Sequence, residues 1–349
     1  MDVNIDYNLA FKSISDKLKK RFLRKPNVSD AIDEYTTLSK QLEADECFSL
    51  SASCLQQVAK SYHSVGNAIS ESAALQSAAK NYLQSEIITT IESNNVNFNE
   101  DLVSTISVYE EAIRLHCDQN DRHLSAKLCL ELADILVAKF EKYFEALAYY
   151  ERAIVLLVNT DSTNPIYAIL IQLKLAALRV FTCDYTGALN LYSEITNSIS
   201  SYCIINPPNN RTMYSRINKN ESSNQIITTS KPIGSAHLLV EADILKLLLI
   251  LYLKPTKMKP DYTISLEAYS SFQALSTQNF NYLPITCMNR DVFILLQSFV
   301  LACQSNDLKQ MCSLQTELWP HFNDVQNYLL NMITDQFFNS SYTDDLLSQ

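Results

Sequence analysis

The sequence contains very little glycine: only Gly66, Gly187 and Gly234 occur among 349 residues. An all-β fold needs many tight turns, which draw heavily on glycine, so this scarcity argues against that class. It also excludes the glycine-rich phosphate loops of the GxGxxG and GxxxxGK kinds. The composition favours an all-α fold with helices joined by short polar turns.

Motifs for catalysis are missing as well. The sequence has no HExxH, GxSxG, Walker or kinase signature, and its five histidines are mostly dispersed. The densest group of metal-binding side chains is His116, Cys117, His123 and Cys129. A turn is predicted within this group, and structural zinc sites have tighter paired spacings. We therefore expect no enzyme activity, no metal and no cofactor.

The cysteines and the apolar runs indicate the cellular compartment of the protein and whether it spans a membrane. Nine cysteines, an odd number, occur without a CxxC pair and without a signal peptide ahead of them, which is typical of a reducing compartment. The longest apolar run, Leu238–Leu253, contains Glu241, Asp243 and Lys246, so it is too short and too charged to span a bilayer. We expect a buried helix there, and a cytoplasmic protein without a transmembrane segment.

Apolar residues recur with the helical period along most of the chain. Two stretches share a finer spacing, in which small and branched residues on one helix precede alanine and tyrosine on the next: Leu132, Ala133, Leu136, Ala146, Tyr150 and Ala153, then Leu175, Ala176, Ala188, Tyr192 and Ile195. Small residues let two helices approach, while each tyrosine fills the gap to the neighbouring pair. The spacing resembles a degenerate tetratricopeptide repeat and predicts an α-solenoid of antiparallel helical hairpins, with an irregular helical bundle as the alternative.

Local signals predict where individual helices begin and end. Ser29 is expected to cap the first hairpin helix, Leu50 to lie on the apolar side of the next, and Val65–Asn67 to form a turn. Residues 89–101 are polar and rich in asparagine, which is typical of a loop. Asn323 opens the last helix, with Gln326 at the spacing of a capping box.

Composition divides the chain into five segments. The polar stretch at residues 201–234, with prolines and a run of Asn, Ser and Thr, has little apolar surface to bury and is interpreted as a flexible linker. The predicted organisation follows: a basic amphipathic helix at 1–28, tetratricopeptide-like hairpins at 29–200, the linker at 201–234, an acidic helical block at 235–339, and a disordered tail at 340–349.

Charge is distributed unevenly on this chain, whose net charge is -10. The nine residues from Lys17 to Lys25 carry six cations. On a helix, Phe11, Ile14, Leu18 and Phe22 would form an apolar stripe beside this basic flank. Three interpretations remain open: the stripe packs on the chain's own next helix, the flank meets an acidic partner, or the helix adsorbs to an anionic membrane. A net-acidic chain without a recognised binding module makes nucleic acid a poor fourth. The candidate partner-binding residues here are Lys17, Lys19, Lys20, Arg21, Phe22 and Arg24.

The C-terminal quarter has the opposite sign. Residues 261–349 contain Arg290 and Lys309 against nine carboxylates, which gives a net charge of -7 and suggests a partner surface of basic character. The single tryptophan, Trp319, is expected to fill the core between the last three helices, with a partner contact as the alternative role. The candidate partner-binding residues of this block are Glu317, Trp319, Asp324 and Asp335.

The stretch Ser15–Val28, SDKLKKRFLRKPNV, resembles the N-terminal signature of the 40-kDa huntingtin-associated protein family, also called the factor VIII intron 22 proteins. Further similar stretches are DYTGAL at 184–189, LLQS at 295–298, WP at 319–320 and QNYLL at 326–330, so the resemblance spans nearly the whole chain. Family members carry a proline-rich insert where this linker is rich in asparagine and serine. A spacer tolerates that difference, whereas a proline-reading docking motif does not.

The resemblance implies a partner, because members of the family bind huntingtin, a very large HEAT-repeat solenoid, and sit between its lobes. It also implies a link to an early-endosomal Rab GTPase, an early-endosome association with a further nuclear pool, and a helical architecture like that of the soluble attachment proteins of vesicle fusion.

We therefore expect a non-enzymatic adaptor or scaffold subunit that binds and stabilises huntingtin. Two alternatives remain. One is a vesicle-trafficking adaptor of the soluble attachment protein type, recruited to membranes through the basic helix and acting without huntingtin. The other is an undetected helical enzyme.

Overall fold

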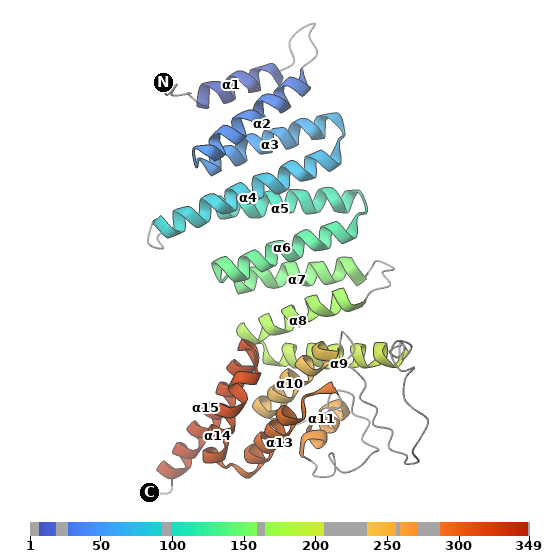
Figure 1. Cartoon of the computed structure of the whole chain (residues 1–349), viewed down its shortest axis with the longest axis vertical. Coiled ribbons are helices and arrows are strands. Elements are labelled where there is room, and N and C mark those ends of the chain that lie inside the picture. The colour runs from blue at the N-terminus through green and yellow to red at the C-terminus, as the bar shows by residue number, and fades with distance from the viewer. Residues whose placement is uncertain are drawn as a thin grey trace, which may run out of the picture. The chain divides into compact units, whose positions relative to one another are not determined.

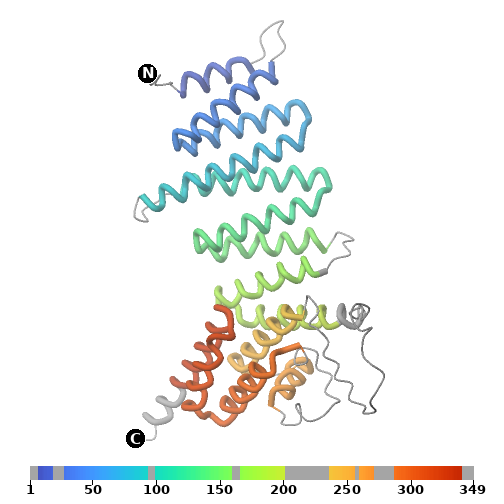
Figure 2. The backbone as a smooth tube through the Cα atoms, viewed as in Figure 1, coloured from blue at the N-terminus to red at the C-terminus, as the bar shows by residue number. Residues whose placement is uncertain are grey.

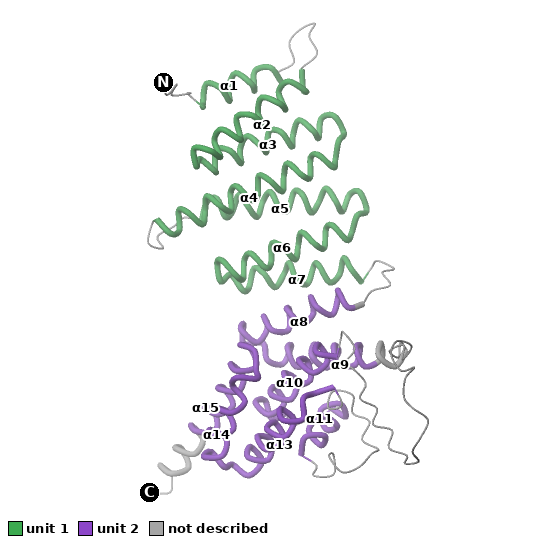
Figure 3. The backbone as a smooth tube through the Cα atoms, viewed as in Figure 1, with its two compact units in different colours: residues 1–163 green, residues 164–349 purple. Residues whose placement is uncertain are grey.

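Every regular element that the structure describes is a helix, so the expected all-α class is confirmed (Figure 1). The chain divides into two compact units, Met1–Thr163 (unit 1) and Asn164–Gln349 (unit 2) (Figure 3). The computed structural model describes most of the chain: residues 7–18, 27–92, 99–158, 165–205, 236–255, 259–270 and 287–347.

Unit 1 is a stack of antiparallel helices in which each helix packs mainly against its neighbours in sequence (Figure 2). This is the tetratricopeptide-like arrangement of helical hairpins that the sequence predicts. Its helices are α1 (Tyr7–Leu18), α2 (Val28–Ala44), α3 (Phe48–Val65), α4 (Ala68–Glu92), α5 (Glu100–Asp118), α6 (Arg122–Phe140) and α7 (Tyr143–Val158).

The predicted alanine and tyrosine spacing accounts for the packing of α6 on α7. Ala133 and Ala146 are fully buried, so the two helix backbones approach closely at this point. Tyr150 is also buried, and its hydroxyl donates a hydrogen bond of 2.5 Å to Asp134 Oδ1 on α6. The aromatic ring thus fills the space between the helices while its polar end is satisfied.

Polar side chains also join helices inside unit 1. Asn81 on α4 donates to Glu43 Oε1 on α2 at 2.6 Å and to Ser51 Oγ on α3 at 3.0 Å, and Ser51 shares a 2.8 Å hydrogen bond with Ser39. Ser39 and Ser51 are buried, whereas Leu50 is 49% exposed. Leu50 is thus not buried, but it lines the same apolar cleft as Cys54 four residues later, so it lies on the apolar side of α3 as predicted.

In the turns of unit 1, residues after helix C-termini take the left-handed backbone conformation, as is common at such ends. Gly66 has φ 75°, which confirms the predicted turn at Val65–Asn67. Glu46, Asn120 and Glu141 take the same region, with φ values of 58°, 59° and 53°. With so few glycines, the chain places larger residues where glycine is usual.

Several helices begin or end at other residues than the sequence predicts. The N-cap of α2 is Asn27, whose side-chain oxygen accepts from the Asp30 amide, so the assignment of this cap to Ser29 is wrong. Helix α4 continues to Glu92 and α5 begins at Glu100, so the loop between them is shorter than the predicted 89–101. The two helices thus overlap the predicted loop at 89–92 and 100–101, and residues 93–98 lie outside the described residues.

Unit 2 is organised around one helix, α10, which packs against α9, α11 and α15. Its buried residues cover all sides of the helix, as predicted for the apolar run at 238–253. The helices of unit 2 are α8 (Pro165–Phe181), α9 (Tyr185–Ile205), α10 (Ala236–Leu253), α11 (Pro260–Ser270), α13 (Arg290–Ser305), α14 (Leu308–Leu318) and α15 (Asp324–Leu347), with a 3-10 turn at Trp319–His321.

Two charged residues of α10 are buried with a polar partner. Lys246 Nζ lies 3.2 Å from Asp243 Oδ1, and the Tyr269 hydroxyl donates to Asp243 Oδ2 at 2.9 Å. All three residues are buried, and the pair is spaced i, i+3 along the helix. The charges that interrupt the apolar run in the sequence therefore compensate each other inside the core.

The division into units differs from the predicted segments. It falls between Thr163 and Asn164, and α9 and α10 pack together although the predicted linker at 201–234 lies between them in sequence. Helix α9 runs to Ile205, so residues 201–205 are helical, and the rest of that linker lies outside the described residues. Helix α15 extends to Leu347 where a disordered tail at 340–349 was expected.

Candidate partner-binding surfaces

The N-terminal helix α1 lies against α2 through its apolar stripe. Ile14 is buried, and the Phe11 ring meets the Tyr35 ring edge to face, with centroids 5.2 Å apart. Of the three interpretations of the basic helix, packing on the chain's own next helix is therefore confirmed for residues 7–18. The predicted helical course through Phe22 to Lys25 lies outside the described residues.

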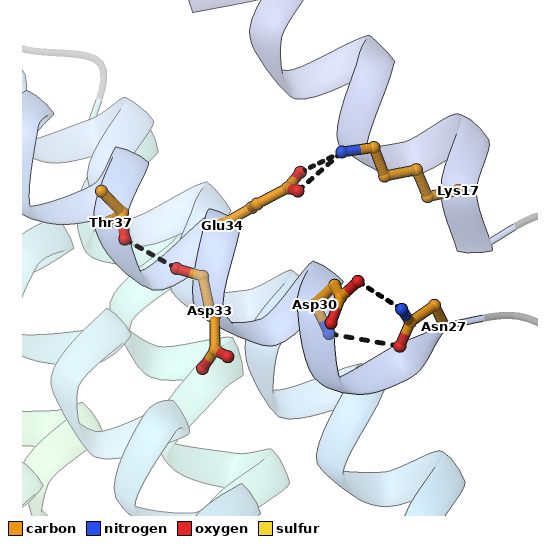
Figure 4. Close-up of polar contacts among 6 residues, drawn as sticks. All are labelled: Lys17, Asn27, Asp30, Asp33, Glu34 and Thr37. Carbon is orange, nitrogen blue, oxygen red and sulfur yellow. Dashed lines mark hydrogen bonds and ion pairs between the residues drawn. The ribbon is translucent and has the colours of Figure 1, made fainter.

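Lys17, at the end of α1, points toward the carboxylate of Glu34 in the first turns of α2 (Figure 4). Lys17 Nζ lies 2.6 Å from both carboxylate oxygens of Glu34. Asp30 and Asp33 are exposed in the preceding turns, where negative charge also favours a helix N-terminus. Since the side chains of Lys17 and Glu34 are 46% and 39% exposed, the pair adds little stability.

Helix α1 is not closely packed along its length. A cleft of about 410 Å³ lies on one side of it, beside Ile14 and Glu34, and another of about 260 Å³ lies on the other side, beside Phe11 and Leu42. Of the six N-terminal candidates, the structure places Lys17 alone. The others lie outside the described residues: Lys19, Lys20, Arg21, Phe22 and Arg24.

The C-terminal candidates are all exposed and lie on α14, the 3-10 turn and α15 of unit 2. Glu317 and Trp319 are close in sequence at the end of α14, and Asp324 opens α15. Asp335 follows Asp324 by eleven residues, which is about three helical turns, so both carboxylates project from one side of α15 about 16 Å apart. All four residues are thus accessible to a partner, and whether they form one acidic surface remains a prediction.

Trp319 does not fill the core, which corrects the expected role of this residue. Its side chain is 47% exposed, while Leu318 and Phe322 on either side of it are buried. The side-chain amide of Asn327 donates to the carbonyls of Trp319 at 3.2 Å and Phe322 at 3.3 Å, so the backbone of the turn is held firmly. An exposed tryptophan on a fixed turn is suited to a partner contact.

The capping box predicted at the start of α15 is confirmed. The backbone N–H of Gln326 donates to Asn323 Oδ1 at 2.9 Å, and the backbone N–H of Asn323 donates to Gln326 Oε1 at 3.0 Å. Asn323 Nδ2 also donates to Glu241 Oε1 on α10 at 2.9 Å. Burial raises the pKa of Glu241, while the charge of His237 and the hydrogen bond from Asn323 act in the opposite direction.

Exposed apolar side chains of unit 1 form a further set that sequence periodicity missed. Ile69 is 83% exposed and Phe144 is 76% exposed, and both lie in the first turn of a helix, directly after a hairpin turn. Helical periodicity assigns a face but does not show where a helix end extends beyond its neighbours. These side chains are suited to contact another protein, although single exposed apolar residues are common in any protein.

The candidate zinc residues are not gathered around a common point. His116 Nε2 shares a 2.7 Å hydrogen bond with Ser72 Oγ, and Cys117 Sγ donates to Ser125 Oγ at 3.3 Å. Cys129 is buried, and desolvation raises the pKa of its thiol to about 12. Within the described ranges, three or more His, Cys, Asp or Glu side chains nowhere come close enough to hold a metal ion.

The packing of antiparallel helices places the protein in the class of all-α helical-hairpin proteins. A model of the family described as "Soluble NSF attachment protein, SNAP" matches residues 24–204, which is more than half of the chain, so the chain belongs to that family. In the parts of the chain that the structure describes, no helix combines the length and apolar character needed to cross a bilayer.

Two relatives are similar to this chain over nearly its whole length. The 40-kDa huntingtin-associated protein of Mus musculus is 28% identical over an alignment of 366 positions, which covers 96% of this chain and 94% of the relative. The protein of the same name from Rattus norvegicus is 27% identical with the same coverage. The resemblance noted at the basic stretch and at the C-terminal motifs therefore extends along the chain.

Proposed function

We propose that this chain is a non-enzymatic adaptor subunit that binds and stabilises a huntingtin-type HEAT-repeat solenoid. The observation that carries the proposal is the similarity to huntingtin-associated proteins over 96% of the chain. A link to Rab-dependent motility of early endosomes, and the corresponding endosomal and nuclear localisation, belong to the same proposal.

Two kinds of surface would take part in the interaction. Exposed apolar side chains at the hairpin ends of unit 1, such as Phe144 and Ile69, would contribute buried area. In unit 2, Trp319 would enter a pocket of the partner, and the surrounding carboxylates would face basic residues of the partner. Charges at such a rim mainly set the orientation and the association rate, while a buried tryptophan contributes more to affinity.

The experiment combines affinity purification of the tagged chain with a binding assay on the purified partner. We expect a very large HEAT-repeat protein in near-stoichiometric amount. The triple variant Glu317→Gln, Asp324→Asn, Asp335→Asn should bind about threefold to tenfold more weakly and with a smaller dependence on salt. Trp319→Ala should weaken binding by more than about tenfold while leaving thermal stability unchanged.

A matched control removes three exposed carboxylates of unit 1 through Glu92→Gln, Glu100→Gln and Asp118→Asn. The control makes the same change in net charge. If both triple variants lose the same affinity for the partner, the carboxylates of unit 2 have no specific role in binding. If no HEAT-repeat protein is recovered, the proposal fails. Binding to anionic vesicles that requires Lys19, Lys20, Arg21 and Arg24 would then support the membrane-recruited adaptor, which the family match also favours.

A further inference from the structure

Unit 2 contains an apolar cleft where the ends of several helices meet. The cleft has a volume of about 370 Å³, at the lower end of the size range of small-ligand sites. It is bordered by the C-terminal end of α10 and by α11, α13 and α15. Six of its lining residues provide apolar or thiol surface: Ile250, Leu251, Pro255, Leu266, Cys303 and Phe337.

One cation lines this cleft, and its geometry is unusual. Lys254 follows the last residue of α10 and takes a left-handed conformation with φ 45°, which favours glycine. Its backbone N–H donates to the Ile250 carbonyl at 3.0 Å. Its ammonium nitrogen lies 3.9 Å from the centroid of the Phe337 ring, close enough for a cation–π interaction.

The Lys254 ammonium differs in its partners from two other lysines of unit 2. Lys246 is paired with Asp243, and Lys259 donates to Asn190 Oδ1 at 2.8 Å. Among the described residues, no carboxylate lies within ion-pair distance of Lys254. The cleft thus combines apolar walls with one ammonium group that has no anionic partner among the residues that the structure describes.

We propose that the cleft binds a fatty carboxylate, with its acyl chain along Ile250, Leu251 and Leu266 and its carboxylate on Lys254 Nζ. Each methylene moved from water into the cleft favours binding, and the carboxylate gains a charge-assisted hydrogen bond. Burial raises the pKa of the Cys303 thiol to about 12, so this wall of the cleft carries a thiol rather than a reactive thiolate. The proposed contacts are an ion pair and apolar packing, so binding is non-covalent, and it is independent of the proposed adaptor function.

The test is calorimetric titration of the full chain with decanoate below its micelle concentration. We expect saturable binding at one site. Lys254→Gln should weaken the affinity about tenfold because it removes a charge-assisted hydrogen bond, whereas Lys254→Arg should retain it. Lys259→Gln is the matched control, since Lys259 also lies over an aromatic ring, that of Tyr262, but does not line the cleft.

A second set of variants tests the acyl-chain position. Leu266→Trp should fill the cleft and abolish binding. If circular dichroism shows that this variant is unfolded, Gln304→Trp is used instead, because Gln304 is an exposed residue that also lines the cleft. The proposal is overturned if decanoate does not bind, if decyltrimethylammonium binds equally well, or if Lys254→Gln and Lys259→Gln behave alike. Binding to fatty-acid vesicles but not to monomeric decanoate would overturn it as well.

Discussion

Units 1 and 2 are both built from helices, but they connect these helices differently. In unit 1 the main contacts are between helices adjacent in sequence, as in a repeat array. In unit 2 the central helix α10 also packs on α15, and the hydrogen bond from Asn323 to Glu241 joins residues 82 positions apart. Stability in an array is approximately a sum of local terms, whereas a core around one helix is lost as a whole. We therefore expect unit 1 to respond locally to substitution and unit 2 to respond throughout.

The polar side chains that join helices within each unit differ as well. In unit 1, Tyr150 and Asp134 join neighbouring helices at a partly buried position, and Arg152 on α7 reaches Glu110 on α5 at 2.8 Å. In unit 2, Asp243 and Lys246 are charged and nearly inaccessible to solvent. A fully buried charge depends strongly on its partner, because water cannot replace that partner.

The largest expected effect is at this buried pair. Asp243→Ala leaves the Lys246 ammonium buried without its carboxylate and should destabilise unit 2 by about 3–5 kcal/mol. Chemical denaturation gives the free energy of unfolding, and hydrogen exchange by mass spectrometry shows which helices lose protection. Faster exchange should extend over α9, α10, α11 and α15, while unit 1 keeps its protection.

The control for this variant removes both charges. Asp243→Leu combined with Lys246→Met should recover most of the lost stability, since an apolar pair of similar volume often substitutes well for a buried ion pair. If the single variant lowers protection in α10 alone, the view of unit 2 as one cooperative core is wrong.

A smaller and more local effect is expected in unit 1. Ala146→Leu inserts bulk where α7 meets α6 and should cost about 1–3 kcal/mol. Faster hydrogen exchange should remain within α6, α7 and their immediate neighbour. Ala148→Leu, at an exposed position of the same helix, is the matched control and should be nearly neutral. Loss of protection reaching α2 would contradict the local behaviour of the array.

The smallest effect concerns Glu241 and depends on pH. Burial raises the pKa of this carboxyl above its ordinary value of 4.5, so the folded state holds a proton more readily than the unfolded chain. Its contribution to stability is complete below the ordinary pKa and is lost as pH rises through the folded pKa. Glu241→Gln, which keeps an acceptor for Asn323, should therefore be more stable than the wild type at pH 7.

The difference in thermal stability between Glu241→Gln and the wild type should shrink as pH falls toward 4. Glu267→Gln removes a charge at an exposed position of α11 and serves as the control. If the difference in thermal stability between Glu241→Gln and the wild type instead grew as pH falls, Glu241 would stabilise unit 2 in its ionised form.

The sequence predicted the hairpins of this chain because their chemistry is local. Ala133, Ala146 and Tyr150 meet within one hairpin, and the reciprocal bonds of Asn323 and Gln326 lie within one helical turn. The buried side of α3 was harder to predict, since Ser51 is buried through partners on α2 and α4 that no local pattern indicates. The division into units depends on the contact of α10 with α15, which is distant in sequence.

The candidate site could be predicted only in part for similar reasons. Charge counting located the acidic C-terminal surface, and Glu317, Asp324 and Asp335 are exposed there. The exposure of Trp319 depends on the direction of a 3-10 turn that the Asn327 side chain holds, which residue type alone does not reveal. Whether these residues contact a partner remains a prediction.

The non-local packing of α10 has a consequence for synthesis on the ribosome. The helices of unit 1 can assemble in order as they emerge, because each packs mainly on helices that have already been made. Helix α10 is apolar on all sides and emerges well before α15, which must be made before the core of unit 2 can close. At about 5–20 residues per second, the 82 positions from Glu241 to Asn323 correspond to roughly 4–16 seconds. During this interval α10 lacks its last packing partner, and the nascent chain is most dependent on chaperones.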